Sequence, residues 1–123
     1  MVVVGTLIAE SLRGGALIQT VSLTATRIRR ANLGDVDAGQ PRTWTCIEFE
    51  VADEAAERLA TELEGSLQEA GGWYCDFRSD RETFVVFANR TFRYLRGDES
   101  ARAAAVEYGR SVGVPEAQLD WPV

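Results

Sequence analysis

The fold of this chain is decided by residues 43–51, which read TWTCIEFEV. Side chains of two kinds alternate through this run, which is the pattern of a β-strand with two different faces. One face carries Thr45, Ile47, Phe49 and Val51, and the other carries Trp44, Cys46, Glu48 and Glu50. The run therefore predicts a strand with one side on the core and the other side toward solvent.

The residues that follow predict a helix over 53–70, with Asp53 as its cap and Gly71-Gly72 at its end. Apolar residues recur at helical spacing, so one stripe of the helix packs on the sheet. The stripe consists of Ala56, Leu59, Ala60, Leu63 and Leu67. We expect Leu59, Leu63 and Leu67 to be buried.

Four further strands are predicted along the chain. β-branched residues favour the first of them, with a bulge near Ile28, and apolar residues favour the other three. They span 20–30, 73–78, 82–88 and 91–95. A polar loop after the first strand holds Gly34, Asp35, Asp37, Gly39 and Pro41.

A second helix is predicted to begin at its cap Asp98 and to end at Gly113. Residues 1–19 fit no element clearly, although Leu7, Ile8 and Leu12 suit a short amphipathic helix. The order of elements predicts a single α+β domain over residues 1–123. We expect a two-layer sandwich, in which a largely antiparallel sheet of about 4–5 strands carries two main helices on one face. The crossover helix allows one parallel pair of strands.

The charges exclude several classes of function. The chain of 123 residues has a net charge of -6, its 13 basic residues are all arginine, and it has no histidine. An acidic chain repels phosphate groups, so we expect neither nucleic acid nor a membrane as partner. Without lysine there is no Schiff base, and without histidine there is no Ser-His-Asp triad and no histidine-bound zinc.

Two cysteines, Cys46 and Cys75, are too few for a disulfide scaffold. Their predicted positions on opposite faces of the sheet leave them as free thiols. The opening MVVVGTLIA lacks the basic start and the cleavage site of a signal peptide. No apolar run reaches the roughly 20 residues of a membrane helix. We therefore expect a cytoplasmic protein, with no cofactor and no metal.

Carboxylates gather on the polar face of the predicted sheet. Glu48 and Glu50 share one strand face, and Asp76 is placed near them across the sheet. Such a group can transfer protons or hold a hard metal, but charged residues are also usual on the solvent face of an antiparallel sheet. Arginines on the predicted strands and their turns can pair with these acids, or bind an acidic partner or a small anion. They are Arg27, Arg29, Arg30, Arg78, Arg81, Arg90, Arg93 and Arg96.

Two tryptophans are assigned to different faces. Trp44 lies on the polar face, where an amphipathic aromatic is typical of an interface anchor, unless the N-terminal segment or residues 119–121 cover it. Trp73 shares its phase with Cys75 and Phe77 and is predicted to lie in the core.

Three runs resemble a group of short, uncharacterised bacterial proteins. They are GWYCDF at 72–77, FRYLRGD at 92–98 and YGRSVGVPEAQLDW at 108–121. The resemblance is closest in the C-terminal half and looser over 43–70. It implies a bacterial, cytosolic origin, and it brings no activity, cofactor or catalytic residue.

The leading hypothesis is a non-enzymatic binding or protein-interaction module that self-associates as a homodimer or docks on another protein. Its interaction face comprises Trp44, Glu48, Glu50, Tyr74, Asp76 and Arg78. One alternative is a small enzyme that uses carboxylates and arginine, and another is a sensor of a small anionic ligand. A deep pocket around the carboxylates favours the enzyme, and a flat, exposed sheet counts against it.

Overall fold

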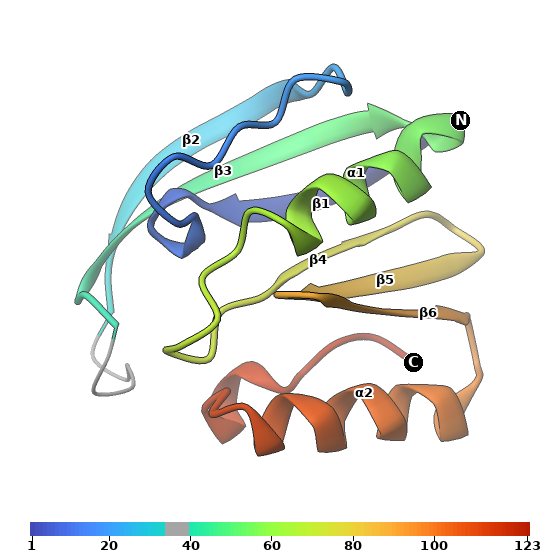
Figure 1. Cartoon of the computed structure of the whole chain (residues 1–123). Helices are drawn as coiled ribbons and strands as arrows, with labels where there is room; N and C mark the ends of the chain where they lie inside the picture. The colour runs from blue at the N-terminus through green and yellow to red at the C-terminus, as the bar shows by residue number, and fades with distance from the viewer. Residues whose placement is uncertain (34–39) are drawn as a thin grey trace.

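Six strands form one open sheet in the computed structural model, which describes residues 1–33 and 40–123 (Figure 1). The strands are β1 (Val2–Ile8), β2 (Thr24–Asn32), β3 (Thr43–Ala52), β4 (Cys75–Arg78), β5 (Glu82–Phe87) and β6 (Arg90–Leu95). The helices are α1 (Ala56–Glu64) and α2 (Glu99–Ser111). Gly34, Asp35, Asp37 and Gly39 of the predicted polar loop lie outside the described residues.

The strands follow the order β2-β3-β1-β4-β5-β6, and each neighbouring pair of these described strands is antiparallel. The α+β class and the antiparallel sheet are therefore confirmed. The expected count of about 4–5 strands is too low, and the suggested parallel pair is wrong.

The N-terminal strand β1 is the element that sequence reasoning misses, although it lies in the middle of the sheet. It pairs with β3 on one side and with β4 on the other. Val3 and Leu7 point into the core beneath α1, while Val4, Thr6 and Ile8 belong to the opposite face. Apolar residues on both faces remove the alternation by which a strand is recognised. The short helix predicted from Leu7, Ile8 and Leu12 is therefore wrong.

The two helices cover opposite faces of the sheet, which corrects the prediction that both lie on one face (Figure 1). Successive side chains of β5 point to opposite faces of the sheet, so they belong to two separate hydrophobic cores. Phe84 and Val86 pack with the leucines of α1, whereas Val85 and Phe87 pack with Ala105 of α2. The β4–β6 end of the sheet therefore has a helix on each side, in place of a two-layer sandwich.

The remaining sheet is covered along one side, and on its other side only the part near Trp44 and Cys46 is covered. On the α1 side, Ile18, Val21 and Leu23 from the segment before β2 extend the core over β3. On the other side, α2 and the C-terminal segment cover β4, β5 and β6, and Val4, Arg27 and Arg29 remain exposed. We call the side of β1, β2 and β3 that lies opposite α1 the open face.

The helix α1 is shorter than the predicted helix over 53–70. It ends at Gly65, well before Gly71-Gly72, and Asp53 begins a short 3-10 turn in front of it without acting as a side-chain cap. Leu67 reaches the core from the loop after the helix, where it forms a β-bridge with Leu12. The predicted burial is nevertheless confirmed, at 1% exposure for each of Leu59, Leu63 and Leu67.

Other local predictions are confirmed. Asp98 caps α2 by accepting a hydrogen bond from the Ala101 N–H at 3.0 Å. The register of β2 shifts between Ala25 and Arg27, which is the predicted bulge. No helix in the described part of the chain is long and apolar enough to cross a membrane.

Both cysteines are free and buried, on opposite sides of the sheet as predicted. Cys46 packs with Trp44 and Trp73, whereas Cys75 lies in the core beneath α1. Burial raises the pKa of the Cys75 thiol well above its usual value, so little of the reactive thiolate forms.

Candidate functional site

The charged residues of the predicted interaction face flank the central strand on the open face. In the sheet register Thr6 lies opposite Glu48 on one side and opposite Asp76 on the other. Val4 in the same way separates Glu50 from Arg78. The four charged residues line one hollow of about 270 Å³. They form no group of three or more ligands able to hold a metal ion, and none is found elsewhere among residues 1–33 and 40–123.

The aromatic residues of the predicted face lie on this side but are covered. Trp44 is 8% exposed, with its ring centroid 5.3 Å from that of Trp73, and its Nε1 donates a hydrogen bond to the Pro41 carbonyl at 2.7 Å. Tyr74 donates its hydroxyl to the Gln118 carbonyl at 3.2 Å, and burial raises the pKa of that hydroxyl. Neither is an exposed anchor for a partner, so the prediction of an exposed Trp44 is wrong.

Trp73 is also misplaced by the sequence prediction. It packs with Trp44 and Cys46 on the side opposite the α1 core. Gly71 and Gly72, with φ of 100° and 69°, turn the chain just before it, and β4 begins only at Cys75. The strand alternation that places Cys75 in the core therefore does not extend back to Trp73.

The C-terminal segment after α2 forms a fixed wall beside the open face (Figure 1). Its Leu119 and Trp121 are buried against β5 and α2. Arg102 Nε donates to the Trp121 carbonyl at 2.6 Å, and the Tyr94 hydroxyl donates to the Pro122 carbonyl at 2.6 Å. Several independent contacts thus hold the segment, and the space beside it is formed in advance.

Asp76 lines three adjoining hollows between this wall and the open face, which we call the Asp76 groove. The first is the 270 Å³ hollow that contains the four charged residues. A second, of about 380 Å³, is lined by Gln118, Trp44 and Trp73. A third, of about 410 Å³, lies beside Trp121.

The Asp76 carboxyl is in an unusual state for a surface acid. It forms neither an ion pair nor a hydrogen bond with any other residue in the described part of the chain. Burial raises its pKa to about 6; the neighbouring Arg78 opposes this rise, and Asp120 adds to it. A carboxyl of this kind can release or take up a proton near neutral pH, or it can bind a cation.

Two more polar atoms at the groove lack a partner. Gln118 Oε1 and Trp121 Nε1 are both buried, and neither has a hydrogen-bond partner among the described residues. A buried polar atom without a partner costs about 1–3 kcal/mol. A bound molecule that supplies the missing partners removes this cost.

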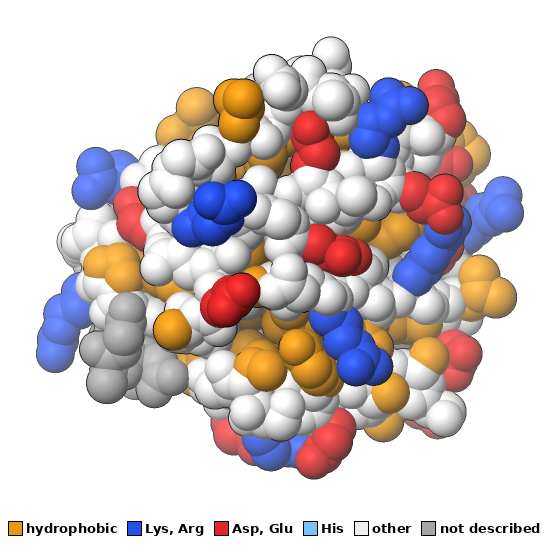
Figure 2. Space-filling model, viewed as in Figure 1, with side chains coloured by type: hydrophobic (Ala, Val, Ile, Leu, Met, Phe, Trp, Pro, Cys, Tyr) orange, Lys and Arg blue, Asp and Glu red, His pale blue; other side chains and the backbone are white. Residues whose placement is uncertain are grey.

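Three arginines of the sheet, Arg27, Arg29 and Arg93, form ion pairs with acids. On the open face, Arg27 Nη1 lies 3.6 Å and Arg29 Nε lies 3.8 Å from Glu48 Oε2. On the α1 side, Arg93 Nε lies 2.6 Å from Glu82. Figure 2 shows the two signs of charge interspersed over the side of the molecule that it views. These three arginines therefore pair with acids of the same protein, which is one of the roles expected from the sequence.

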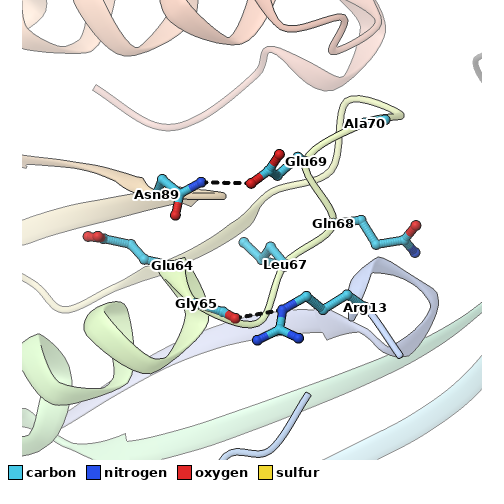
Figure 3. Close-up of a pocket in the computed structure, with 8 residues that line it drawn as sticks. All are labelled: Arg13, Glu64, Gly65, Leu67, Gln68, Glu69, Ala70 and Asn89. Atoms are coloured by element: carbon cyan, nitrogen blue, oxygen red, sulfur yellow. Dashed lines mark hydrogen bonds between the residues drawn. The ribbon is translucent and has the colours of Figure 1, made fainter. Parts of the chain in front are cut away.

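A different hollow, of about 460 Å³, lies between the loop after α1 and the turn at Asn89 (Figure 3). Arg13 Nε donates to the Gly65 carbonyl at 2.8 Å, and Asn89 Nδ2 donates to Glu69 Oε1 at 3.1 Å. These bonds join segments that are distant in the sequence. We call this space the Arg13 hollow, and its polar groups have a structural role.

Searches of protein-family models, curated proteins and solved structures find no match to this chain. The resemblance to short bacterial proteins therefore stays a prediction. Sequence reasoning identifies Glu48, Glu50, Asp76 and Arg78 from strand alternation. It misses Gln118 and the part played by Thr6. The only sequence signal for the wall is the apolar Leu119 and Trp121 beyond the last helix, which were considered as a cover for Trp44.

Proposed function

We propose that this protein is a non-enzymatic binding module that takes a small molecule into the Asp76 groove. The observation that carries the proposal is Asp76 itself, a carboxyl that is desolvated and lacks a partner among the described residues. Burying a charged group without a partner is unfavourable, so strongly perturbed acids are concentrated at functional sites.

The shape of the groove supports a small ligand. Its hollows of about 270–410 Å³ fall near the lower end of the range of ligand sites, which is roughly 300–1,000 Å³. Aromatic side chains form one end, and a few polar atoms converge near Asp76. This combination of apolar walls with a few orienting polar groups is typical of small-molecule sites.

Self-association has less support than a small ligand. An interface anchor is an aromatic side chain that enters a pocket of the partner, and Trp44 is 8% exposed. Arg27 and Arg29 are already paired with Glu48 within the sheet. A homodimer through this face would have to rest on Glu50, Arg78 and apolar atoms of β1.

A second candidate is a small enzyme in which Asp76 transfers a proton. The pKa of about 6 favours this candidate, because a general acid or base works best when its pKa lies near the operating pH. Consumption of the bound compound, in proportion to the amount of protein, distinguishes the enzyme from the binding module.

A thermal-shift screen tests the proposed function. Wild type and Asp76→Asn are screened against amines, amino acids, carboxylates and sugar phosphates, with Glu69→Gln in the Arg13 hollow as the matched control. Because a ligand that binds the folded state raises its melting temperature, we expect one class to stabilise wild type and the control but not Asp76→Asn. No shift for any compound contradicts small-molecule binding. An equal shift in Asp76→Asn places the site elsewhere.

A further inference from the structure

We propose that the ligand of the Asp76 groove is an organic cation, in which a primary ammonium group is attached to an apolar body. This inference rests on the proposed function and narrows it to one class of ligand. It is carried by the 380 Å³ hollow, whose polar and aromatic lining points to a cation.

The polar atoms that lack partners in this hollow are hydrogen-bond acceptors. Asp76 has no partner residue within the described part of the chain, and Gln118 Oε1 is buried without one. Asp120 adds a second carboxylate to the same lining. An ammonium group has three donors and no acceptor, so it can satisfy Asp76 and Gln118 together.

The same carboxylates disfavour an anionic ligand. A phosphate or carboxylate at this position would lie beside both Asp76 and Asp120. Two like charges in a partly desolvated site repel each other strongly. The structure therefore gives the sensor of a small anion, one of the alternatives from the sequence, little support in this hollow.

Aromatic and aliphatic side chains form the rest of the lining. Trp44 and Trp73 lie with their ring planes at 52° to each other, and Tyr74 and Ile8 line the same hollow. Aromatic faces attract cations, an attraction that grows as the site is desolvated. The rings and Ile8 also provide contact surface for an apolar body attached to the ammonium group.

The protein's own cations leave Asp76 available. Arg29 lines the hollow, but its Nε lies 3.8 Å from Glu48. Arg78 follows two residues after Asp76 on β4, and no ion pair joins the two within residues 1–33 and 40–123. Trp121, which is 3% exposed and whose Nε1 has no hydrogen-bond partner among the described residues, lines the adjoining hollow.

Three probes of one shape test the charge of the ligand: 3-methylbutylamine, 3-methylbutanol and 3-methylbutanoate. Binding to the full chain is followed by the fluorescence of the tryptophans that line the hollow and is checked by calorimetry. We expect the amine to bind about tenfold or more tightly than the alcohol, because charge-assisted hydrogen bonds are the stronger ones, and the acid to bind least. Asp76→Asn removes this advantage of the amine, and Glu69→Gln keeps it.

Gln118→Leu is a second variant, for which we expect amine affinity to fall about threefold or more through loss of one acceptor. Equal binding of amine and alcohol, or tightest binding of the acid, overturns the cation inference and leaves the proposed binding function standing. The inference also fails if no probe binds while another class of compound stabilises the protein. Failure of every compound in both experiments overturns the proposed function as well.

Discussion

The Arg13 hollow and each hollow of the Asp76 groove are of comparable size, but the two regions use their polar groups in opposite ways. In the Arg13 hollow, Arg13 and Asn89 each donate a hydrogen bond to another segment of the chain (Figure 3), and Gln68 does the same. The bond from Gln68 Nε2 to the Glu10 carbonyl is 2.7 Å long. Around this hollow, hydrogen bonds hold together the N-terminal segment, the loop after α1 and the β5–β6 turn.

In the Asp76 groove, the corresponding atoms are left without partners. Asp76 forms no ion pair or hydrogen bond with another described residue, and Gln118 Oε1 and Trp121 Nε1 have no partner among them. The pKa of Asp76 is raised by burial, and no compensating bond lowers it to the ordinary value. The presence of a hollow is therefore poor evidence for function, whereas polar atoms around a hollow that lack hydrogen-bond partners are better evidence.

The contrast has a thermodynamic consequence. Groups that bond across a hollow stabilise the folded state, and groups kept without partners destabilise it. Proteins commonly give up stability at functional sites in this way. Substitutions in the two regions should therefore change the free energy of unfolding with opposite signs.

The largest effect is expected at Leu67, which lines the Arg13 hollow and is 1% exposed. Leu67→Ala removes buried methyl groups and leaves a cavity, so we expect it to lower the free energy of unfolding by about 2–5 kcal/mol in urea melts. Leu95→Ala is the control, because Leu95 is 64% exposed and its loss should cost about 0.5 kcal/mol or less. Similar costs for the two variants would show that the loop is not part of the core.

The second effect is a gain in stability at Asp76. The pKa is about 6 in the folded protein and 3.8 as an ordinary value, so the folded state holds a proton that the unfolded state releases in this window. The contribution of Asp76 to the stability of wild type therefore falls as the pH rises from about 4 to about 6. Asp76→Asn has no such group, and a shift of two pKa units makes it more stable than wild type by about 2–3 kcal/mol at about pH 7.5.

Urea melts of both proteins across this pH range check that prediction. The charged and titratable groups near Asp76 are present in both proteins and cancel in the difference between them. They are Arg29, Arg78, Asp120, Glu48, Glu50, Tyr74, Cys75 and Tyr94. Glu10, Glu62 and Glu82 have lowered pKa values and destabilise the fold on acidification, but they cancel in the same way. A difference that does not shrink toward about pH 4 would contradict the assignment to Asp76.

The fold of the α1 side is readable from the sequence because its signals are local. The stripe through Leu59 and Leu63 depends on residues within a single short segment. The cap at Asp98, which belongs to α2 on the other face, is equally local. The central strand is not readable in this way. Val2–Ile8 is apolar on both faces, so it lacks the alternation that identifies residues 43–51.

Prediction of the site is limited in the same way, because only its strand residues follow a local sequence pattern. Glu48, Glu50, Asp76 and Arg78 follow from strand alternation, which needs only the period of two. The wall of the groove depends on where an irregular segment docks after α2, and no periodicity encodes this. Placement of α2 on the face opposite α1 likewise depends on the whole of β5, which is apolar on both sides.

Substitution of one glutamine in each region tests the contrast between the two regions through smaller changes in the free energy of unfolding. Gln68→Leu loses the bond to the Glu10 carbonyl, so we expect it to cost about 1 kcal/mol. Gln118→Leu removes an acceptor that is buried without a partner, so we expect it to raise stability by about 1 kcal/mol. Chemical denaturation of both variants measures the sign of the change in the free energy of unfolding for each. Equal signs would remove the distinction between the two hollows.

The smallest effect is expected from Glu69→Gln, the same change of carboxylate to amide as Asp76→Asn. Glu69 is exposed, and its Oε1 accepts a hydrogen bond from Asn89 Nδ2 at 3.1 Å, which the amide oxygen of glutamine can also accept. We therefore expect a change in the free energy of unfolding within about 0.5 kcal/mol, with little dependence on pH. Because the chemical change is the same at both positions, urea melts of the two variants compare their environments alone. A gain at Glu69→Gln as large as that at Asp76→Asn would mean that removal of negative charge from an acidic chain, and not burial of Asp76, is what stabilises both.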